Sequence, residues 1–302
     1  MKRILLLGSM AIYALFFNTS GMAEPASKTA TLSLPFKSNS QWMLEIPSDG
    51  PVVYHGVYSL DEAGTGKGGM LYPAPSAAGL VAAIVTHALI INSAKNDQKN
   101  QLQLNADQVL SNYQEALNNF KYGELIQRTV DRVSIIHAAE HVKAQGYSDR
   151  KMIIESAPTF MLTQDQKTVI INDSIVIRMP GQTPEVAYKS LIRVISNADN
   201  SADSSLFWTG NQGENIKGIS SQLHAQSIDI ALQTFVAGKS TENKPFQTVR
   251  YREGLSDKVE RAQVIHKDCE RMLIKNLRGM FISAPVVKSV ENGCETMTEF
   301  KT

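Results

Sequence analysis

The hydrophobic pattern of the chain changes near Met152, and this change constrains the fold more than any other feature. From that point, β-branched and apolar residues form short runs separated by turn-forming residues, a pattern typical of strands. Polar residues at 164–167 and the pair Asn172-Asp173 divide the first runs, which predicts an antiparallel meander. The predicted strands are Met152–Leu162, Thr168–Ile171 and Ser174–Met179. Tyr188–Ser196 fits either a strand or a helix, and its β-branched residues favour a strand.

The rest of the C-terminal half mixes one helix with further strands. A polar loop is expected at 197–215, carrying an apolar cluster at Leu206, Phe207 and Trp208. A helix is then expected over Glu214–Ala237, with Gly238 as its C-terminal stop. Three more strand-like segments follow Pro245, namely Phe246–Arg252, Lys258–His266 and Arg271–Ile282.

The N-terminal half predicts an extended arm, a strand and helices. Trp42, Leu44 and Ile46 favour an added edge strand in the arm. Residues 52–60 predict a second strand, followed by a glycine-rich loop at 64–69. The segment 77–91 carries no charge. As a helix it would be about 22 Å long, which is shorter than the hydrocarbon core of a lipid bilayer. This apolar helix is expected to be buried in the core, or else to insert into a membrane or a partner.

Two amphipathic helices are expected next. Asn105 is a candidate N-cap for the first, whose apolar residues recur at helical spacing from Val109 to Phe120. The second spans 123–145, with Ile126, Val130 and Val133 on one stripe. The chain is therefore expected to be α+β, with an arm and helical region at 24–146 and a mainly antiparallel β region at 147–302. These regions form two lobes or one continuous domain.

The first 23 residues have the pattern of a secretory signal. Lys2 and Arg3 precede a short apolar run, and small residues up to Ala23 fit a cleavage site. We expect cleavage near Ala23 and export to the bacterial periplasm, or secretion. The chain holds 30 basic and 29 acidic residues, a balance that gives no reason to expect a nucleic-acid partner.

The chain has 2 cysteines, Cys269 and Cys294. In an oxidising compartment an even pair predicts one disulfide bond, here closing the C-terminal segment onto the preceding strands. Their spacing is far from the C-x-x-C pattern of redox-active pairs.

One segment has the spacing of a metal-dependent hydrolase. His137-Ala138-Ala139-Glu140-His141 matches H-x-x-E-H, in which two histidines one helical turn apart bind zinc and the glutamate activates a bound water. Glu214 is the candidate third ligand. The alternative is that these are ordinary helix residues, and in that case no cofactor is expected.

Basic residues recur along the last strand-like segments. Outward positions there would form an anionic-ligand surface, for example for lipid headgroups. Acidic residues are interleaved with the basic ones, so an ordinary solvated sheet face is the alternative. The candidate residues are Arg250, Arg252, Arg261, Arg271, Lys275 and Arg278.

These observations favour a non-enzymatic cell-envelope protein that binds or scaffolds through the apolar helix and the basic sheet. Its expected partners are an envelope protein, an anionic lipid surface or a second copy of the chain docked through 77–91. The alternatives are a Zn²⁺-dependent hydrolase using the motif at 137–141 and a carrier that encloses a small apolar ligand.

Overall fold

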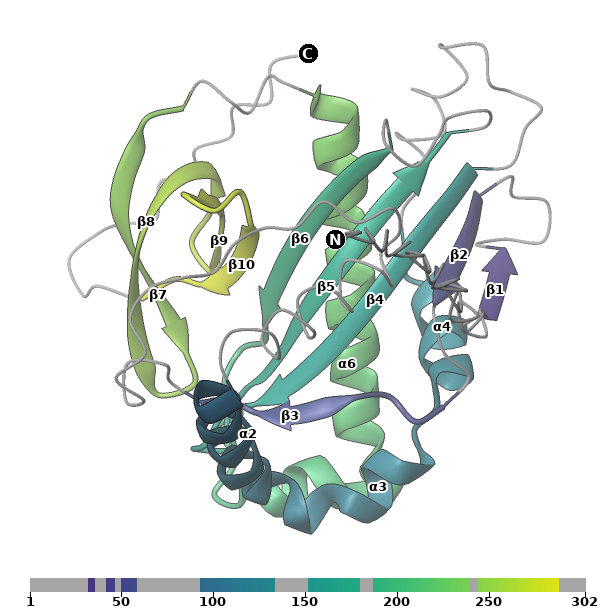
Figure 1. The fold of residues 1–302 in the computed structure, drawn as a ribbon, viewed down its shortest axis with the longest axis vertical. Helices are drawn as coiled ribbons and strands as arrows, with labels where there is room; N and C mark the ends of the chain where they lie inside the picture. The colour runs from purple at the N-terminus through teal and green to yellow at the C-terminus, as the bar shows by residue number, and fades with distance from the viewer. Residues whose placement is uncertain are drawn as a thin grey trace, which may run out of the picture.

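The computed structural model describes residues 32–35, 42–46, 50–58, 93–133, 152–179, 187–238 and 244–287. Within these residues one mixed 10-stranded sheet carries helices against it, which confirms the predicted α+β class (Figure 1). In spatial order the sheet contains β1 (Leu32–Pro35), β2 (Trp42–Ile46), β4 (Met152–Leu162), β5 (Val169–Arg178), β6 (Tyr188–Ile195), β10 (Phe281–Pro285), β9 (Arg271–Asn276), β8 (Ser256–Lys267) and β7 (Phe246–Glu253), with β3 (Tyr54–Gly56) also beside β4.

The central strands follow the sequence pattern, with one correction. β4 has the predicted bounds, and β4, β5 and β6 form the expected antiparallel meander. The turn predicted at Asn172-Asp173 is wrong, because β5 runs without a break and pairs both residues with β4 and β6. Asp173 stays in this buried strand because two serine hydroxyls hydrogen-bond its carboxylate.

The helices before the meander begin and end differently from the expectation. The structure has α2 (Ser93–Asp107), a 3₁₀ helix η1 (Gln108–Tyr113), α3 (Gln114–Asn119) and α4 (Tyr122–Val130). Asn105 therefore lies inside α2 and does not cap a helix. α4 ends at Val130, earlier than predicted, and 134–145 lie outside the described residues. The stripe of Ile126, Val130 and Val133 is buried as predicted.

Helix α6 (Ser204–Ala237) begins earlier than predicted, so the loop expected at 197–215 is wrong from Ser204 onward. The helix breaks at Gly210–Gly213, where three residues have positive φ, and continues to Gly238, which ends it with φ +55°. The break separates the expected apolar cluster from the main helix. Trp208 is fully buried and donates its indole N–H to the carbonyl oxygen of Gln166 at 2.6 Å, whereas Leu206 is 70% exposed.

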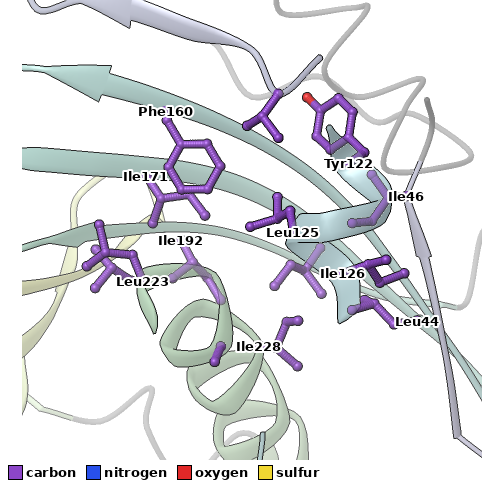
Figure 2. Close-up of a cluster of buried hydrophobic side chains, with 14 of the residues drawn as sticks. Leu44, Ile46, Tyr122, Leu125, Ile126, Phe160, Ile171, Ile192, Leu223 and Ile228 are labelled. Atoms are coloured by element: carbon purple, nitrogen blue, oxygen red, sulfur yellow. The ribbon is translucent and has the colours of Figure 1, made fainter. Parts of the chain in front are cut away.

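The main core lies between the sheet and two helices. Figure 2 shows Leu223 and Ile228 of α6 near Ile171 and Ile192 of the sheet, with residues of α4 beside β2. Burying each such side chain contributes about 1.5–3 kcal/mol. The packing of α6 behind β4, β5 and β6 therefore holds this half of the sheet together (Figure 1).

The C-terminal strands curl away from α6. The segment expected as one strand, Arg271–Ile282, is split into β9 and β10 by a turn in which Gly279 has φ +80°. Beyond it, β7 approaches β10 again through a bridge between Tyr251 and Val286, so the four strands enclose a second, smaller core. Apolar residues of this core include Val249, Tyr251, Ala262, Met272, Ile274, Ile282 and Ala284.

The N-terminal arm joins the same sheet. Trp42, Leu44 and Ile46 form β2, which lies second from the edge because β1 pairs outside it. Of the strand expected at 52–60, the structure forms the short β3. The glycine-rich loop at 64–69 and the apolar segment 77–91 lie outside the described residues. Among the residues that are described, no helix is long and apolar enough to cross a membrane.

Candidate functional site

The zinc motif cannot be placed within the described structure. His137, Glu140 and His141 lie outside the described residues, so the motif stays a prediction. Glu214, the candidate third ligand, is described: Arg128 donates to both of its carboxylate oxygens, at 2.8 and 3.0 Å. This guanidinium lowers the pKa of Glu214. In the described ranges, no group of three or more His, Cys, Asp or Glu side chains is arranged to hold a metal ion.

The predicted disulfide is described at one end. Cys269 lies in the turn between β8 and β9 and is disulfide-bonded, while Cys294 lies outside the described residues. The pairing of these two cysteines stays a prediction.

A buried polar cluster, not predicted from the sequence, joins α6 to the meander. Ser156 Oγ lies 2.8 Å from both Asp173 Oδ1 and His224 Nε2. Ser227 Oγ lies 2.6 Å from Asp173 Oδ2, and Thr129 Oγ1 lies 3.0 Å from the other ring nitrogen of His224. We call these five residues the buried polar cluster.

The buried polar cluster has the residue types of a hydrolase triad without its geometry. In a triad the histidine stands between the nucleophile and the carboxylate, whereas here Ser156 stands between His224 and Asp173. The side chain of His224 is 0% exposed, and the two serines are also buried. A substrate has no route to this hydroxyl in the described structure, so the geometry fits a structural role better than a nucleophilic one.

The two serine hydroxyls of the cluster donate to the carboxylate of Asp173. The Nε2–H of His224 donates to Ser156, which donates to Asp173 Oδ1. Ser227 Oγ donates to Asp173 Oδ2 at 2.6 Å and also lies 2.8 Å from the carbonyl oxygen of His224. Burial disfavours the charged form of each group: it raises the pKa of Asp173 to about 6 and lowers the pKa of His224 to about 3.

Strand register gathers four of the predicted basic residues on one face. Residues directly opposite one another on antiparallel strands share a face of the sheet. The paired positions are Thr248 with Arg261, Arg250 with Val259, Arg252 with Asp257 and Gln263 with Lys275. Because side chains alternate along each strand, Arg250, Arg252, Arg261 and Lys275 lie on the same side. We call these four residues the basic face.

The interleaved acidic residues are mostly on the other side. Glu253 and Glu260 occupy alternate positions, opposite Ser256 and Val249, and so point away from the basic face. Asp257 is the acidic residue that shares it, and its Oδ1 lies 3.1 Å from Nε of Arg252. The register has therefore sorted charges that are mixed in the sequence.

The basic face is also partly apolar. Val259, which pairs with Arg250, is 55% exposed, and Phe246 at the start of β7 is 39% exposed. Leu255, in the turn between β7 and β8, is exposed as well. An exposed surface that combines cationic and apolar side chains suits the boundary of an anionic membrane.

Two of the predicted basic residues lie elsewhere. Arg271 points into the protein and donates to the carbonyl oxygen of Ile195 at 2.7 Å and to that of Ser283 at 3.2 Å. Its burial lowers the pKa of its guanidinium. Arg278 is exposed in the turn between β9 and β10. Arg271 lies on the same side of β9 as Lys275, but its guanidinium is held by these carbonyl oxygens, and Arg278 lies in a turn; neither is counted in the basic face.

A cleft of about 410 Å³ separates the C-terminal half of α6 from β8, β9 and β10. Its walls include Ile230 of α6 and Ile265 and Leu273 of the sheet. The sequence predicts the elements that form it but not their approach. A β-bulge between Val264 and His266, which helps shape this wall, has no clear signal in the sequence.

Comparison of the chain with protein-family models, with curated proteins and with solved structures gave no match.

Proposed function

We propose that this protein is a non-enzymatic binding protein of the bacterial cell envelope whose basic face contacts an anionic lipid surface. The observation that carries the proposal is the strand register, which places Arg250, Arg252, Arg261 and Lys275 on one face with a single acidic residue. The export signal expected at residues 1–23 supports an envelope location.

Electrostatics and apolar contact support the proposal together. Each Lys or Arg held near an anionic bilayer contributes about 1 kcal/mol of binding free energy. Of the basic face, Arg252 is already paired with Asp257, which reduces its contribution. Val259 and Leu255 are exposed beside these charges and can enter the headgroup region.

The buried polar cluster supports a non-enzymatic role. It is the described group that most resembles a catalytic triad, yet its order is wrong and its side chains are buried. We therefore interpret the cluster as a structural link between α6 and the meander.

The proposal is tested by co-sedimentation of the purified protein with lipid vesicles. Vesicles of phosphatidylcholine alone are compared with vesicles that also contain phosphatidylglycerol. We expect binding only to the anionic vesicles, weakening as salt is raised because salt screens the charges. The double variant Arg250→Gln/Arg261→Gln removes two charges and is expected to weaken binding by roughly 25-fold.

Arg132→Gln is the matched control, because Arg132 is an exposed arginine on the turn after α4. This variant should bind anionic vesicles as the unchanged protein does. Equal binding to neutral and anionic vesicles, or equal losses in the control and the double variant, would contradict the proposal.

A further inference from the structure

The cleft beside α6 adjoins the basic face. Leu273 of β9 lines the cleft, and Lys275 of the basic face follows it two residues later on the same strand. Because side chains alternate along a strand, Leu273 and Lys275 project from the same side of β9, about 7 Å apart. Figure 1 shows α6 on one side of this region and the curled strands on the other. The cleft and one cation of the basic face are therefore within reach of a single small ligand.

The cleft has room and apolar walls for a short hydrocarbon chain. Its volume of about 410 Å³ lies in the range of sites for small molecules. Ile230 of α6 forms one wall, and Ile265 and Leu273 form the other. Each methylene group that such walls remove from water strengthens binding by about fourfold.

The charged side chains that line the cleft already have partners. Asp268 Oδ2 lies 3.7 Å from His266 Nε2, and Asp268 Oδ1 accepts from two backbone N–H groups, at 2.8 and 2.7 Å. The Arg271 guanidinium donates to two backbone carbonyl oxygens, and Asp229 has an interaction of its own. The lining of the cleft therefore gives no strong preference for either sign of charge.

Lys275 supplies that preference. In register it lies opposite Gln263 of β8 and Phe281 of β10. Its Nζ lies 5.5 Å from the centre of the Phe281 ring, and among the described residues it forms no ion pair. An anionic head group can therefore approach this ammonium without displacing a carboxylate.

We propose that the cleft binds a single-chain anionic amphiphile of the fatty-acid type, with its hydrocarbon chain between α6 and β9 and its carboxylate at Lys275. The apolar walls select for the chain, and the lysine selects for the head. This binding shares Lys275 with the proposed membrane contact but does not require a membrane.

The test compares octanoate, octanol, octylamine and hexanoate by isothermal titration calorimetry with the full chain. We expect octanoate to bind most tightly and octylamine most weakly of the three eight-carbon probes. Hexanoate should bind roughly tenfold more weakly than octanoate, because two fewer methylene groups are buried. Octylamine binding as tightly as octanoate, or equal binding of the two carboxylates, would overturn the proposal.

Two variants locate the chain and the head. Lys275→Gln should weaken octanoate binding by roughly three- to fivefold and leave octanol binding unchanged. Ala237→Phe fills the cleft from the end of α6 and should weaken binding of both probes. Lys121→Gln, at an exposed lysine before α4, is the control and should bind octanoate like the unchanged protein. Unchanged octanoate binding in both Lys275→Gln and Ala237→Phe would overturn the assignment.

Vesicle co-sedimentation separates this inference from the proposed function. Ala237→Phe should bind phosphatidylglycerol vesicles as the unchanged protein does, whereas Arg250→Gln/Arg261→Gln should lose vesicle binding and keep octanoate binding. Octanoate binding by a protein that ignores vesicles would support the cleft and contradict the proposed function. An equal loss of octanoate binding in the double variant and in Lys275→Gln would move the carboxylate away from the cleft and overturn the assignment.

Discussion

The two halves of the sheet treat their polar residues in opposite ways. Where α6 covers β4, β5 and β6, Asp173 and His224 are buried and favour neutral forms. Where β7 and β8 extend past α6, Arg250 and Arg261 are exposed on an open face. The difference follows from coverage by one helix, because burial penalises a charge that solvent would stabilise.

The largest expected effect compares one histidine from each environment. His224→Ala removes a fully buried ring and leaves Ser156 and Thr129 without their imidazole partner. We expect it to reduce the free energy of unfolding by about 3–5 kcal/mol. His266→Ala, at a partly exposed histidine that lines the cleft, should change it by less than about 0.5 kcal/mol. Urea denaturation at neutral pH measures both, and similar losses would show that the two environments do not differ as described.

The next prediction concerns pH. The pKa of Asp173 is raised from 3.8 to about 6, so the folded chain keeps a proton that the unfolded chain has lost in this window. Stability from Asp173 therefore falls as pH rises from 3.8 to 6, by about 3 kcal/mol in total. The pKa of His224 is lowered from 6.5 to about 3, so its contribution is lost as pH falls through that window. Between about pH 4 and 6 the two slopes oppose each other.

Single variants should separate these slopes. Asp173→Asn leaves the histidine, and stability should then rise with pH across this interval. His224→Gln leaves the aspartate, and stability should instead fall. The free energy of unfolding, measured in urea at several pH values and compared with the unchanged protein, checks the signs. Slopes of the same sign in both variants would contradict the opposite pKa shifts of Asp173 and His224.

The sequence predicted the elements whose signals are local. Met152–Leu162 is a long run that forms β4 with those bounds, and Gly238 ends α6 as its position suggests. Asn172 and Asp173 misled the prediction because Asn and Asp are favoured in turns, and the partners that keep Asp173 in a strand are distant in sequence. Ser156 lies 17 residues away and Ser227 lies 54 residues away.

The candidate surfaces depended on information that one sequence lacks. Basic and acidic residues alternate irregularly between Arg250 and Arg261, and the strand register decides which of them share a face. Arg271 has the same residue type as Arg250, yet it points inward because carbonyl oxygens of Ile195 and Ser283 surround it. Residue type predicted the charge, whereas only tertiary structure gave its direction.

A smaller effect distinguishes two arginines of the basic face. Arg250 is exposed and pairs in register with Val259, whereas Arg252 lies 3.1 Å from Asp257. Arg250→Gln should weaken binding to phosphatidylglycerol vesicles by about fivefold. Arg252→Gln should weaken it by less, because Asp257 already offsets part of that charge. Co-sedimentation at low salt checks the order, and a larger loss for Arg252→Gln would show that the pairing does not shield it.

The smallest effect concerns the exposed pair that joins α4 to α6. Arg128 bonds both oxygens of Glu214, and such exposed pairs contribute about 0.2–1 kcal/mol. A double-mutant cycle of Arg128→Gln and Glu214→Gln should give a coupling energy in this range.

The same variants test the metal hypothesis, because a carboxylate already held by Arg128 is a poor candidate for a zinc ligand. We expect elemental analysis to give the same metal content with and without Glu214→Gln. Stoichiometric zinc that is lost in Glu214→Gln, and also in His137→Ala and His141→Ala, would instead assign Glu214 to the metal and favour the hydrolase over the binding protein.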